Sequence, residues 1–310
     1  MLRYACLAGI LLACICCIPL STPAYAQTQN SNIVRVGLYV LNVGKIDVAS
    51  GTFVVDFYLS MRCAGSRCNM GSFEFMNGQA TSIQLIENKT TEKFWRIEAN
   101  LYVSPDLQHY PFDSHVLAIR IEDTSLTSEG VTYEPDPSNS GLDPSIAIVG
   151  WTLAGWTQTV ANHYYKVYNE TYSQYTFSVN VVRDPVSATE IFIPVFFLVL
   201  IALIAMLMYG ETSTVLENRI ILTATALVAA VLFQFSLNSN LPPHGYLTFA
   251  DKLMIVTYGI MVVGLLIGVT LLNCHHKPDF VRAERIQFYS IRIVPILAVI
   301  VYVLTFRLLA

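Results

Sequence analysis

Long apolar stretches in the second part of the chain constrain its fold more than any other feature. Residues 191–209, 220–241 and 253–274 contain no charged side chain, and residues 289–309 carry charge only at Arg292 and Arg307. Both arginines are near the ends of that stretch, where long side chains can reach the membrane surface. Roughly 20 apolar residues in a helix span the hydrocarbon core of a bilayer. The sequence therefore predicts four membrane-crossing helices.

The composition excludes several classes of protein. Only 13% of the residues are charged, whereas an ordinary soluble domain carries about 25%. The net charge is −4, and nucleic-acid binding needs clustered Lys and Arg, so we expect no nucleic-acid partner. The sequence lacks a nucleophile elbow, a Gly-rich phosphate loop and an HExxH pair. We therefore expect neither an enzyme nor a cofactor or metal site.

The first 26 residues are typical of a cleaved signal peptide. Arg3 precedes an apolar stretch, and Ala24-Tyr25-Ala26 forms an A-x-A cleavage site. A second interpretation is a lipoprotein signal in which Cys14 is lipidated. Both interpretations place the following part of the chain outside the cytoplasm.

The exported part is typical of a β-sandwich. Residues 53–59, 116–121 and 175–181 are rich in β-branched and aromatic side chains, and turn residues such as 135–141 separate such runs. Cys63 and Cys68 lie in this part, where a disulfide can persist. Two free thiols in a turn remain the alternative.

The composition changes near Asp184-Pro185, so we expect three segments: a signal at 1–26, an exported domain at 27–188 and a membrane domain at 189–310. Four crossings behind a cleaved signal place both ends of the mature chain outside. Lys277, Arg282 and Arg285 then lie in a cytoplasmic loop, as the positive-inside rule requires. We expect a multi-pass protein of the cell membrane with its N-terminal domain and C-terminus outside.

One face of the second apolar helix combines an acid, hydroxyls and large apolar groups. At 100° per residue, this face contains Glu217, Ile221, Thr225, Val228, Leu232, Phe235 and Ser239. A ring of such faces would have carboxylates at one end and a constriction that can close a pore by dewetting. A lipid-facing or packed helix is the alternative that helical phase alone leaves open.

Ordered motifs link the two parts of the chain. They are Tyr110-Pro111-Phe112-Asp113, Arg183-Asp184-Pro185, Pro194 within the first apolar helix, Asn240-Leu241-Pro242 and Tyr246-Leu247-Thr248. This order resembles the pentameric ligand-gated (Cys-loop) ion channel family, especially its prokaryotic branch. Val103 and Leu117 stand where animal members carry the two loop cysteines, which is what the prokaryotic branch looks like.

The resemblance implies a fold class and an assembly. It implies a β + α membrane protein, with an N-terminal immunoglobulin-like β-sandwich followed by a four-helix transmembrane bundle. Five identical subunits would surround a pore lined by the face from Glu217 to Ser239. A carboxylate ring at the cytoplasmic end favours monovalent cations. Ile221 occupies a position that is usually polar in conducting members of the family.

The resemblance also implies a junction that couples the exported domain to the helices. Its candidates are Asp47, Asp113 and Arg183, which would form a charged cluster, and Pro242 in the receiving loop. Losing one partner of a partly buried ion network costs roughly 3–5 kcal/mol, which suits a bistable junction. Taken alone, Arg183 is equally well explained as an interfacial anchor before a membrane helix.

A small-molecule site between subunits is the last implication. Its candidates are Phe73, Phe75, Asn77, Glu122, Asp123, Tyr164, Tyr165 and Tyr168 on one side and Arg62 and Arg96 on the other. Tyrosines and carboxylates suit an amine through cation–π contacts and charge, and arginines suit a carboxylate. The expected ligand is therefore a small extracellular molecule such as an amine or an amino acid.

Two other functions stay open. His109 and His115 flank the coupling turn, and histidine titrates near pH 6.5, so the channel could open in response to protons. The apolar helix face and Ile221 also permit a non-conducting membrane sensor that reads a ligand for a partner protein.

Overall fold

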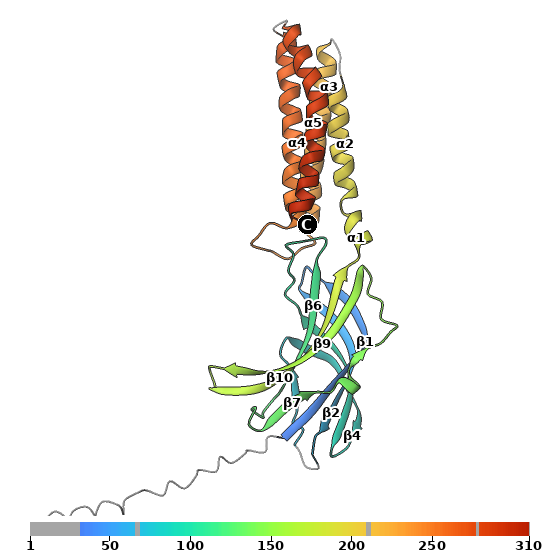
Figure 1. Cartoon of the computed structure of the whole chain (residues 1–310), viewed down its shortest axis with the longest axis vertical. Coiled ribbons are helices and arrows are strands. Elements are labelled where there is room, and N and C mark those ends of the chain that lie inside the picture. The colour runs from blue at the N-terminus through green and yellow to red at the C-terminus, as the bar shows by residue number, and fades with distance from the viewer. Residues whose placement is uncertain (1–31, 66–68, 209–211, 277–278, 310) are drawn as a thin grey trace, which may run out of the picture. The chain divides into compact units, whose positions relative to one another are not determined.

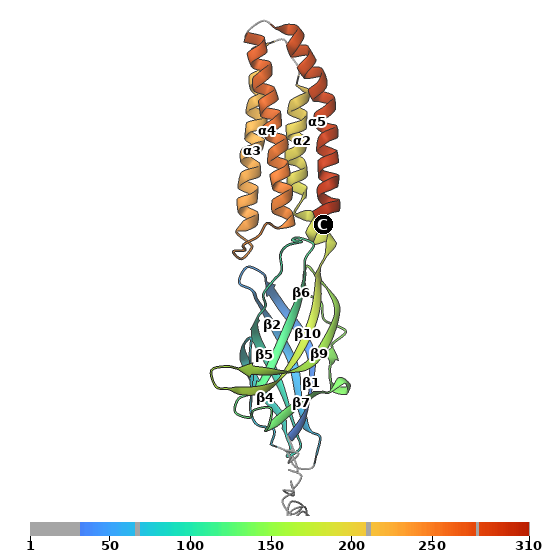
Figure 2. The same cartoon turned by 60° about the vertical axis from the view of Figure 1, so that its left-hand side comes forward.

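The computed structural model describes residues 32–65, 69–208, 212–276 and 279–309. Within them a two-sheet β-sandwich is followed by four long apolar helices that run side by side (Figures 1 and 2), so the predicted fold class is confirmed. The signal predicted at residues 1–26, with Cys14, lies outside the described residues. So does Cys68; Cys63 is disulfide-bonded.

The first sheet has the strand order β4-β5-β2-β1-β7, with β8 also paired to β1. Its strands are β1 (Asn32–Asp47), β2 (Thr52–Cys63), β4 (Gly78–Asn88), β5 (Glu92–Tyr102), β7 (Val131–Pro135) and β8 (Gly141–Leu142). Alternate residues of β1 point into the sandwich, and Leu38 faces Leu59 of β2 in the antiparallel register. The short 3-10 helix η1 (Pro137–Asn139) lies within the predicted turn at 135–141.

The second sheet has the order β3-β6-β10-β9. Its strands are β3 (Phe73–Phe75), β6 (Ser114–Asp123), β9 (Trp151–Tyr165) and β10 (Glu170–Arg183). Ile119 of β6 is paired with Phe177 of β10, and both side chains are fully buried. The inward side chains of the two sheets form one continuous apolar core. This core supports the outer ends of β3, β6, β9 and β10, where the candidate ligand site lies.

The helical part begins directly after β10. Asp184 caps α1 (Pro185–Glu190) by accepting a hydrogen bond from the amide of Val186 at 2.9 Å, and Pro185 suits the first helical position. The long helices are α2 (Ile193–Leu207), α3 (Ser213–Asn238), α4 (Phe249–His276) and α5 (Phe280–Leu309). Four candidate membrane spans, one of which joins α1 to α2, are long and apolar enough to cross a bilayer. The chain is accordingly a multi-pass membrane protein.

The last three helices start earlier than the uncharged stretches suggested. The predicted stretches at 220–241 and 289–309 become helices that begin at Ser213 and Phe280. Hydropathy marks the hydrocarbon core, whereas a helix continues through charged residues into the headgroup region. The helix α3 ends at Asn238 instead of residue 241, because Pro242 disfavours a helical conformation at the residue before it.

Packing within the bundle orients α3. It packs against α2 and α4, while α5 packs against α4 and α2. Small residues of α3, Ala226 and Ala230, are buried beside Met254 and Met261 of α4. A Cβ atom at Gly268 of α4 would lie 2.9 Å from the side chain of Ile220. Glycine at this position therefore permits the close approach of the two helices.

Candidate functional site

The predicted pore face of α3 has no partner within the described chain. Ile221, Val228, Leu232 and Phe235 are 62%, 59%, 64% and 77% exposed. Glu217, Thr225 and Ser239, on the same face, are also exposed. In a membrane protein, an exposed helix face of this kind contacts lipid, water or a second protein surface.

The opposite face of α3 is buried in the subunit's own bundle. Arg219, which the helical phase placed about 160° from Ile221, is fully buried. Its Nη1 donates to Oε1 of Gln287 in α5 at 2.7 Å, and the Gln287 amide donates to the carbonyl of Met206 at 3.2 Å. Within the described residues, the Nε and Nη2 atoms of Arg219 have no hydrogen-bond partner. The only basic residue of α3 therefore points away from the exposed face.

The hydroxyls of the exposed face are bonded to their own helix. Thr225 donates to the carbonyl of Ile221 at 2.8 Å, and Ser239 donates to the carbonyl of Ser236 at 2.7 Å. The middle of the face is therefore apolar in character, with Glu217 as its ionisable group at one end.

Asp113 is the centre of a buried ionic cluster at the start of β6. Arg183, the last residue of β10, donates to its two carboxylate oxygens at 2.6 and 3.0 Å. His115 Nε2 lies 2.6 Å from Asp113 Oδ2. Burial would raise the pKa of Asp113, but hydrogen bonds from His115 and Arg183 outweigh it and lower that pKa to about 2. The carboxylate is therefore ionised throughout the physiological pH range.

The arginine of this cluster is held from two further sides. Its guanidinium carbon lies 4.3 Å from the ring centre of Trp151 and 5.2 Å from that of Tyr110. Cation–π contacts of this kind stabilise a partly desolvated guanidinium. Arg183 is thus fixed in the cluster rather than free to reach lipid headgroups.

The third predicted member, Asp47, does not reach this cluster. It lies in the turn after β1, where it accepts from Lys45 Nζ at 3.1 Å and from the amide of Ser50 at 3.2 Å. The neighbouring Val48 packs instead into an apolar cluster with Leu107, Tyr110, Leu237, Leu241, Ala250 and Ile191. The turn therefore meets the helices through an apolar contact, and His115 takes the place that was expected for Asp47.

Backbone hydrogen bonds join the loop before β6 to the start of α4. The amides of Phe249 and Ala250 donate to the carbonyls of Gln108 and Tyr110 at 2.9 and 3.1 Å. The amide of Leu107 donates to the hydroxyl of Tyr246 at 2.9 Å. The bonds from Phe249 and Ala250 use the first N–H groups of α4, which have no partner within a helix. The loop of the sandwich is thus a cap for a membrane helix.

Aromatic and proline residues complete the junction. The ring of Phe112 is centred 5.8 Å from that of Phe192 and 5.9 Å from that of Phe249. The carbonyl of Pro242 accepts a hydrogen bond from His244 at 2.9 Å. Three of the four predicted coupling residues, Asp113, Arg183 and Pro242, therefore lie in or beside the junction.

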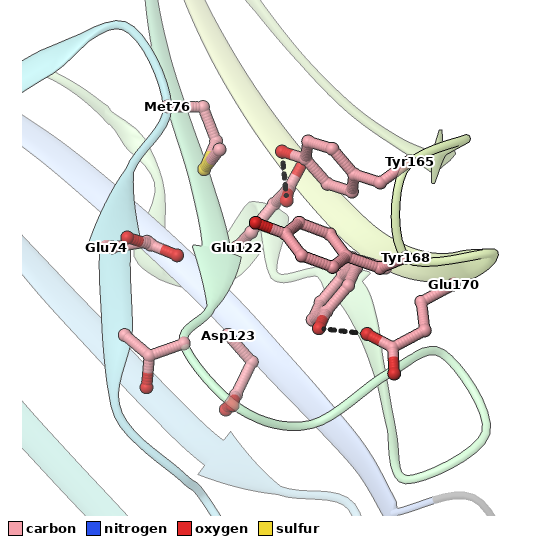
Figure 3. A pocket seen from close by; sticks show the side chains of 9 residues that line it. Glu74, Met76, Glu122, Asp123, Tyr165, Tyr168 and Glu170 are labelled. Atoms are coloured by element: carbon pink, nitrogen blue, oxygen red, sulfur yellow. Dashed lines mark hydrogen bonds between the residues drawn. The ribbon is translucent and has the colours of Figure 1, made fainter.

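A pocket of about 430 Å³ lies under the hairpin formed by β9 and β10. Its lining residues share an acidic or aromatic character, apart from Met76 and Thr124: Glu74, Met76, Glu122, Asp123, Thr124, Tyr165, Tyr168, Glu170 and Tyr172. Figure 3 shows Tyr165 and Tyr168 extending from the hairpin over Glu122. Among the described residues, neither Lys nor Arg lines this pocket. The pocket can therefore attract a cation.

Glu122 is a buried acid of the pocket that several side chains hold in place. It is 2% exposed, and it accepts hydrogen bonds from Tyr165, His163 and Gln174 at 3.0, 2.7 and 2.6 Å. Burial, and then the bond to Glu122, raises the pKa of Tyr165 to about 12. The tyrosine therefore stays a donor at any physiological pH.

A second acid faces Glu122 across the sheet. Glu74 of β3 is directly opposite Glu122 in the antiparallel register. Like charges in this position are destabilising unless a cation or a proton separates them. Tyr172 donates to Glu170 at 2.8 Å on the hairpin side. The arrangement thus concentrates negative charge around an aromatic cavity.

The structure redistributes the predicted ligand residues. Phe73 and Phe75 pack edge-to-face with each other and into the core, while Asn77 donates to the carbonyls of Tyr102 and Ala118. Their neighbours in sequence, Glu74 and Met76, line the pocket instead. Sequence alternation within β3 could have separated the two sets, since successive strand residues point to opposite faces.

Four further predicted residues have other partners. Tyr164 donates to Asn169 at 3.0 Å and does not line the pocket. Arg62 pairs with Asp136, which caps η1 after β7, and Arg96 pairs with Asp56 of β2. Asp123 lines the pocket while one of its oxygens accepts from the amides of Ser125 and Leu126. Both arginines are thus neutralised within this chain.

A comparison with known proteins found a similar protein, and its similarity agrees with the observed fold. No family model matches the chain. A curated protein named "Proton-gated ion channel", from Gloeobacter violaceus, is 23% identical over 288 residues, which cover 82% of this chain and 79% of that protein. The similarity thus extends over both the sandwich and the helices.

Proposed function

We propose that this chain is one subunit of a pentameric ligand-gated ion channel of the cell membrane. The observation that carries the proposal is the exposed α3 face from Glu217 to Ser239, which runs the length of a membrane span. The relative named as a proton-gated ion channel supports it. Five copies of this face around an axis would enclose a pore with Val228, Leu232 and Phe235 as its apolar constriction.

Glu217 sets the proposed selectivity. A ring of five carboxylates at the inner mouth raises the local concentration of cations and repels anions. Arg219 is buried behind α3, bonded to Gln287, so it does not oppose this field in the pore. The channel then prefers monovalent cations, and the sandwich and the C-terminus lie outside the cell.

Substitution of Glu217 tests both the pore and its selectivity. In liposomes or cells with asymmetric salt, Glu217→Gln should shift the reversal potential away from the cation equilibrium value or lower the single-channel conductance. Glu284→Gln is the matched control, because Glu284 is an exposed acid at the start of α5. Equal behaviour of the two variants would remove Glu217 from the pore.

The acidic pocket is the proposed ligand site. Three tyrosines and the carboxylates of Glu74, Glu122 and Glu170 suit a small organic cation, which gains cation–π and charge contacts there. Residues of a neighbouring subunit would close its open side. An amine or the ammonium group of an amino acid is the expected ligand.

Proton gating is the second candidate, and the name of the relative favours it. Current recordings with amine and amino-acid panels at fixed pH, followed by pH steps without ligand, separate the two signals. Verified pentamers that stay silent under both sets of conditions would instead support a non-conducting sensor.

A further inference from the structure

His244 lies in the loop between α3 and α4, between two hydrogen-bond acceptors. Its Nδ1 is 2.9 Å from the carbonyl oxygen of Pro242, and its Nε2 is 3.5 Å from Oδ2 of Asp251 in α4. A carbonyl oxygen only accepts, so Nδ1 carries a proton and donates. In the neutral ring Nε2 then presents a lone pair to a carboxylate. Only the imidazolium can donate to both acceptors.

Asp251 is built into the fold as an anion. It is 5% exposed and accepts from the amide and hydroxyl of Thr248 at 3.1 and 2.8 Å and from the Gln234 amide at 3.2 Å. Within the described residues, His244 is the basic group within 4 Å of its carboxylate. This differs from Asp113, which is paired with Arg183, a side chain that stays charged throughout the physiological pH range. The charge balance at Asp251 therefore depends on whether His244 holds a second proton.

Other titratable groups around His244 do not supply that charge. From α3 the neutral amide of Gln234 faces Asp251, and the hydroxyl of Tyr258 in α4 hydrogen-bonds to Gln234. Lys252 follows Asp251 in α4 and forms no ion pair with it. Asp106 and His109, in the facing loop of the sandwich, are exposed.

The loop that holds His244 also contacts the sandwich. The His244 ring is centred 5.5 Å from that of Tyr246, whose hydroxyl accepts from the amide of Leu107 at 2.9 Å. Phe249, at the start of α4, donates to Gln108 in the same loop. A change in the position of His244 is therefore transmitted to Tyr246 and Phe249, whose hydrogen bonds hold the junction together.

We propose that His244 is a proton-binding site that fastens the α3–α4 loop to Asp251 and, through Tyr246, to the sandwich. At low pH the imidazolium adds a charge-assisted hydrogen bond to Asp251, and at high pH this bond is lost. Only its consequence for gating rests on the proposed channel function. The bond itself is a property of the folded protein.

Hydrogen exchange on the purified full-length protein tests this directly and needs no ion current. Protection factors for residues 241–250, corrected for the intrinsic effect of pH, should be higher at about pH 5 than at about pH 8. The expected ratio is on the order of tenfold, as for one charge-assisted hydrogen bond. Equal protection at both pH values would overturn the proposal.

Variants identify the group responsible. His244→Gln keeps an amide donor but cannot titrate, and Asp251→Asn keeps the imidazole but removes its anionic partner. Each should abolish the pH dependence of protection in residues 241–250, while His109→Gln, an exposed histidine, should retain it. If His244→Gln fails to assemble, Asp251→Asn and the wild-type comparison still decide the question. Retained pH dependence in Asp251→Asn would refute the assignment.

Current recordings separate this proposal from the channel function. If the protein conducts, His244→Gln should shift the half-maximal proton concentration or the pH dependence of the ligand response by about tenfold. A protein that shows pH-dependent protection but never conducts contradicts the channel proposal and leaves the proton site intact. Conduction with no pH-dependent protection does the reverse.

Discussion

Asp113 shows how a single residue can hold the start of β6 against the last residue of β10, directly before the helical part. Its folded pKa of about 2 lies below the ordinary value of 3.8, because bonds from His115 and Arg183 outweigh burial. A depressed carboxylate pKa contributes stability that is fully present above about pH 4 and is lost as the pH falls toward 2. The Asp113 cluster is therefore expected to contribute fully at neutral pH and to weaken only in strong acid, as long as both donors are in place.

Replacing Arg183 with Ala should weaken the ionic cluster around Asp113. Asp113 loses two hydrogen bonds while it stays buried, a change that typically costs about 3–5 kcal/mol. Less stability then remains to be lost on acidification, so acid unfolding should begin at a higher pH than in the wild type. Ligand binding in the sandwich should persist while activation is lost. Chemical unfolding, acid titration and currents measure these effects.

The control for that experiment is Arg35→Ala. Arg35 pairs with Glu134 at 3.7 Å, and both side chains are about half exposed. Exposed pairs contribute roughly 0–1 kcal/mol, so this variant should unfold and activate like the wild type. Activation that survives in Arg183→Ala would remove Arg183 from coupling and leave it a stabilising residue.

The sequence predicted Asp113 and Arg183 together only through a family resemblance. His115 was considered as an isolated titratable group, although it lies two residues after Asp113 and so shares its strand face. Asp47 was placed in the cluster because its turn was expected above the helices. That turn does reach them, but through Val48. Which side chain of a turn makes the contact depends on local backbone geometry that sequence spacing does not determine.

At the scale of elements, the two faces of a strand explain why the predicted pocket residues differ from the observed ones. The hairpin of residues 162–172 was expected, and β9 and β10 form it, with Tyr165 opposite Glu170. In β3, however, Phe73 and Phe75 face the core and Glu74 faces the pocket. Alternation separates Phe73 and Phe75 from Glu74, but a three-residue strand does not show by itself which of the two sets faces the pocket. Its register against Glu122 supplies the missing information.

The β9–β10 hairpin should close the ligand site through Tyr168. Tyr168→Ala should lower the affinity for small organic cations by roughly 3- to 30-fold, since one cation–π contact contributes about 0.5–2 kcal/mol. Tyr164→Ala is the matched control, because Tyr164 lies in the same hairpin, bonds to Asn169 and is outside the pocket. Calorimetric titration of both variants with a panel of amines measures the difference. Equal losses in the two variants would indicate a general effect on the hairpin.

At the scale of the whole molecule, hydropathy predicted the number of membrane spans, and helical phase predicted the orientation of α3. Hydropathy predicted four spans, which the structure contains, but it placed the helix starts too late because charged turns extend beyond the hydrocarbon core. Helical phase placed Glu217 and Leu232 on one face of α3 and Arg219 on the opposite one, and burial agrees. Phase could not reveal what covers the exposed face, because the surface that we propose to cover it belongs to another copy of the chain.

Cross-linking across the proposed fivefold axis tests whether the exposed α3 faces of five subunits meet there. In a Cys274→Ser background, which removes the free thiol found among the described residues, Leu232→Cys should form disulfides between subunits on mild oxidation, because five copies of this exposed position would converge on the axis. Ala230→Cys, fully buried against α4, should not. Five is odd, so each ring can hold at most two such disulfides and must retain one free thiol. Native mass spectrometry with thiol counting measures both numbers, and a dimer or tetramer with all thiols consumed would contradict the pentamer.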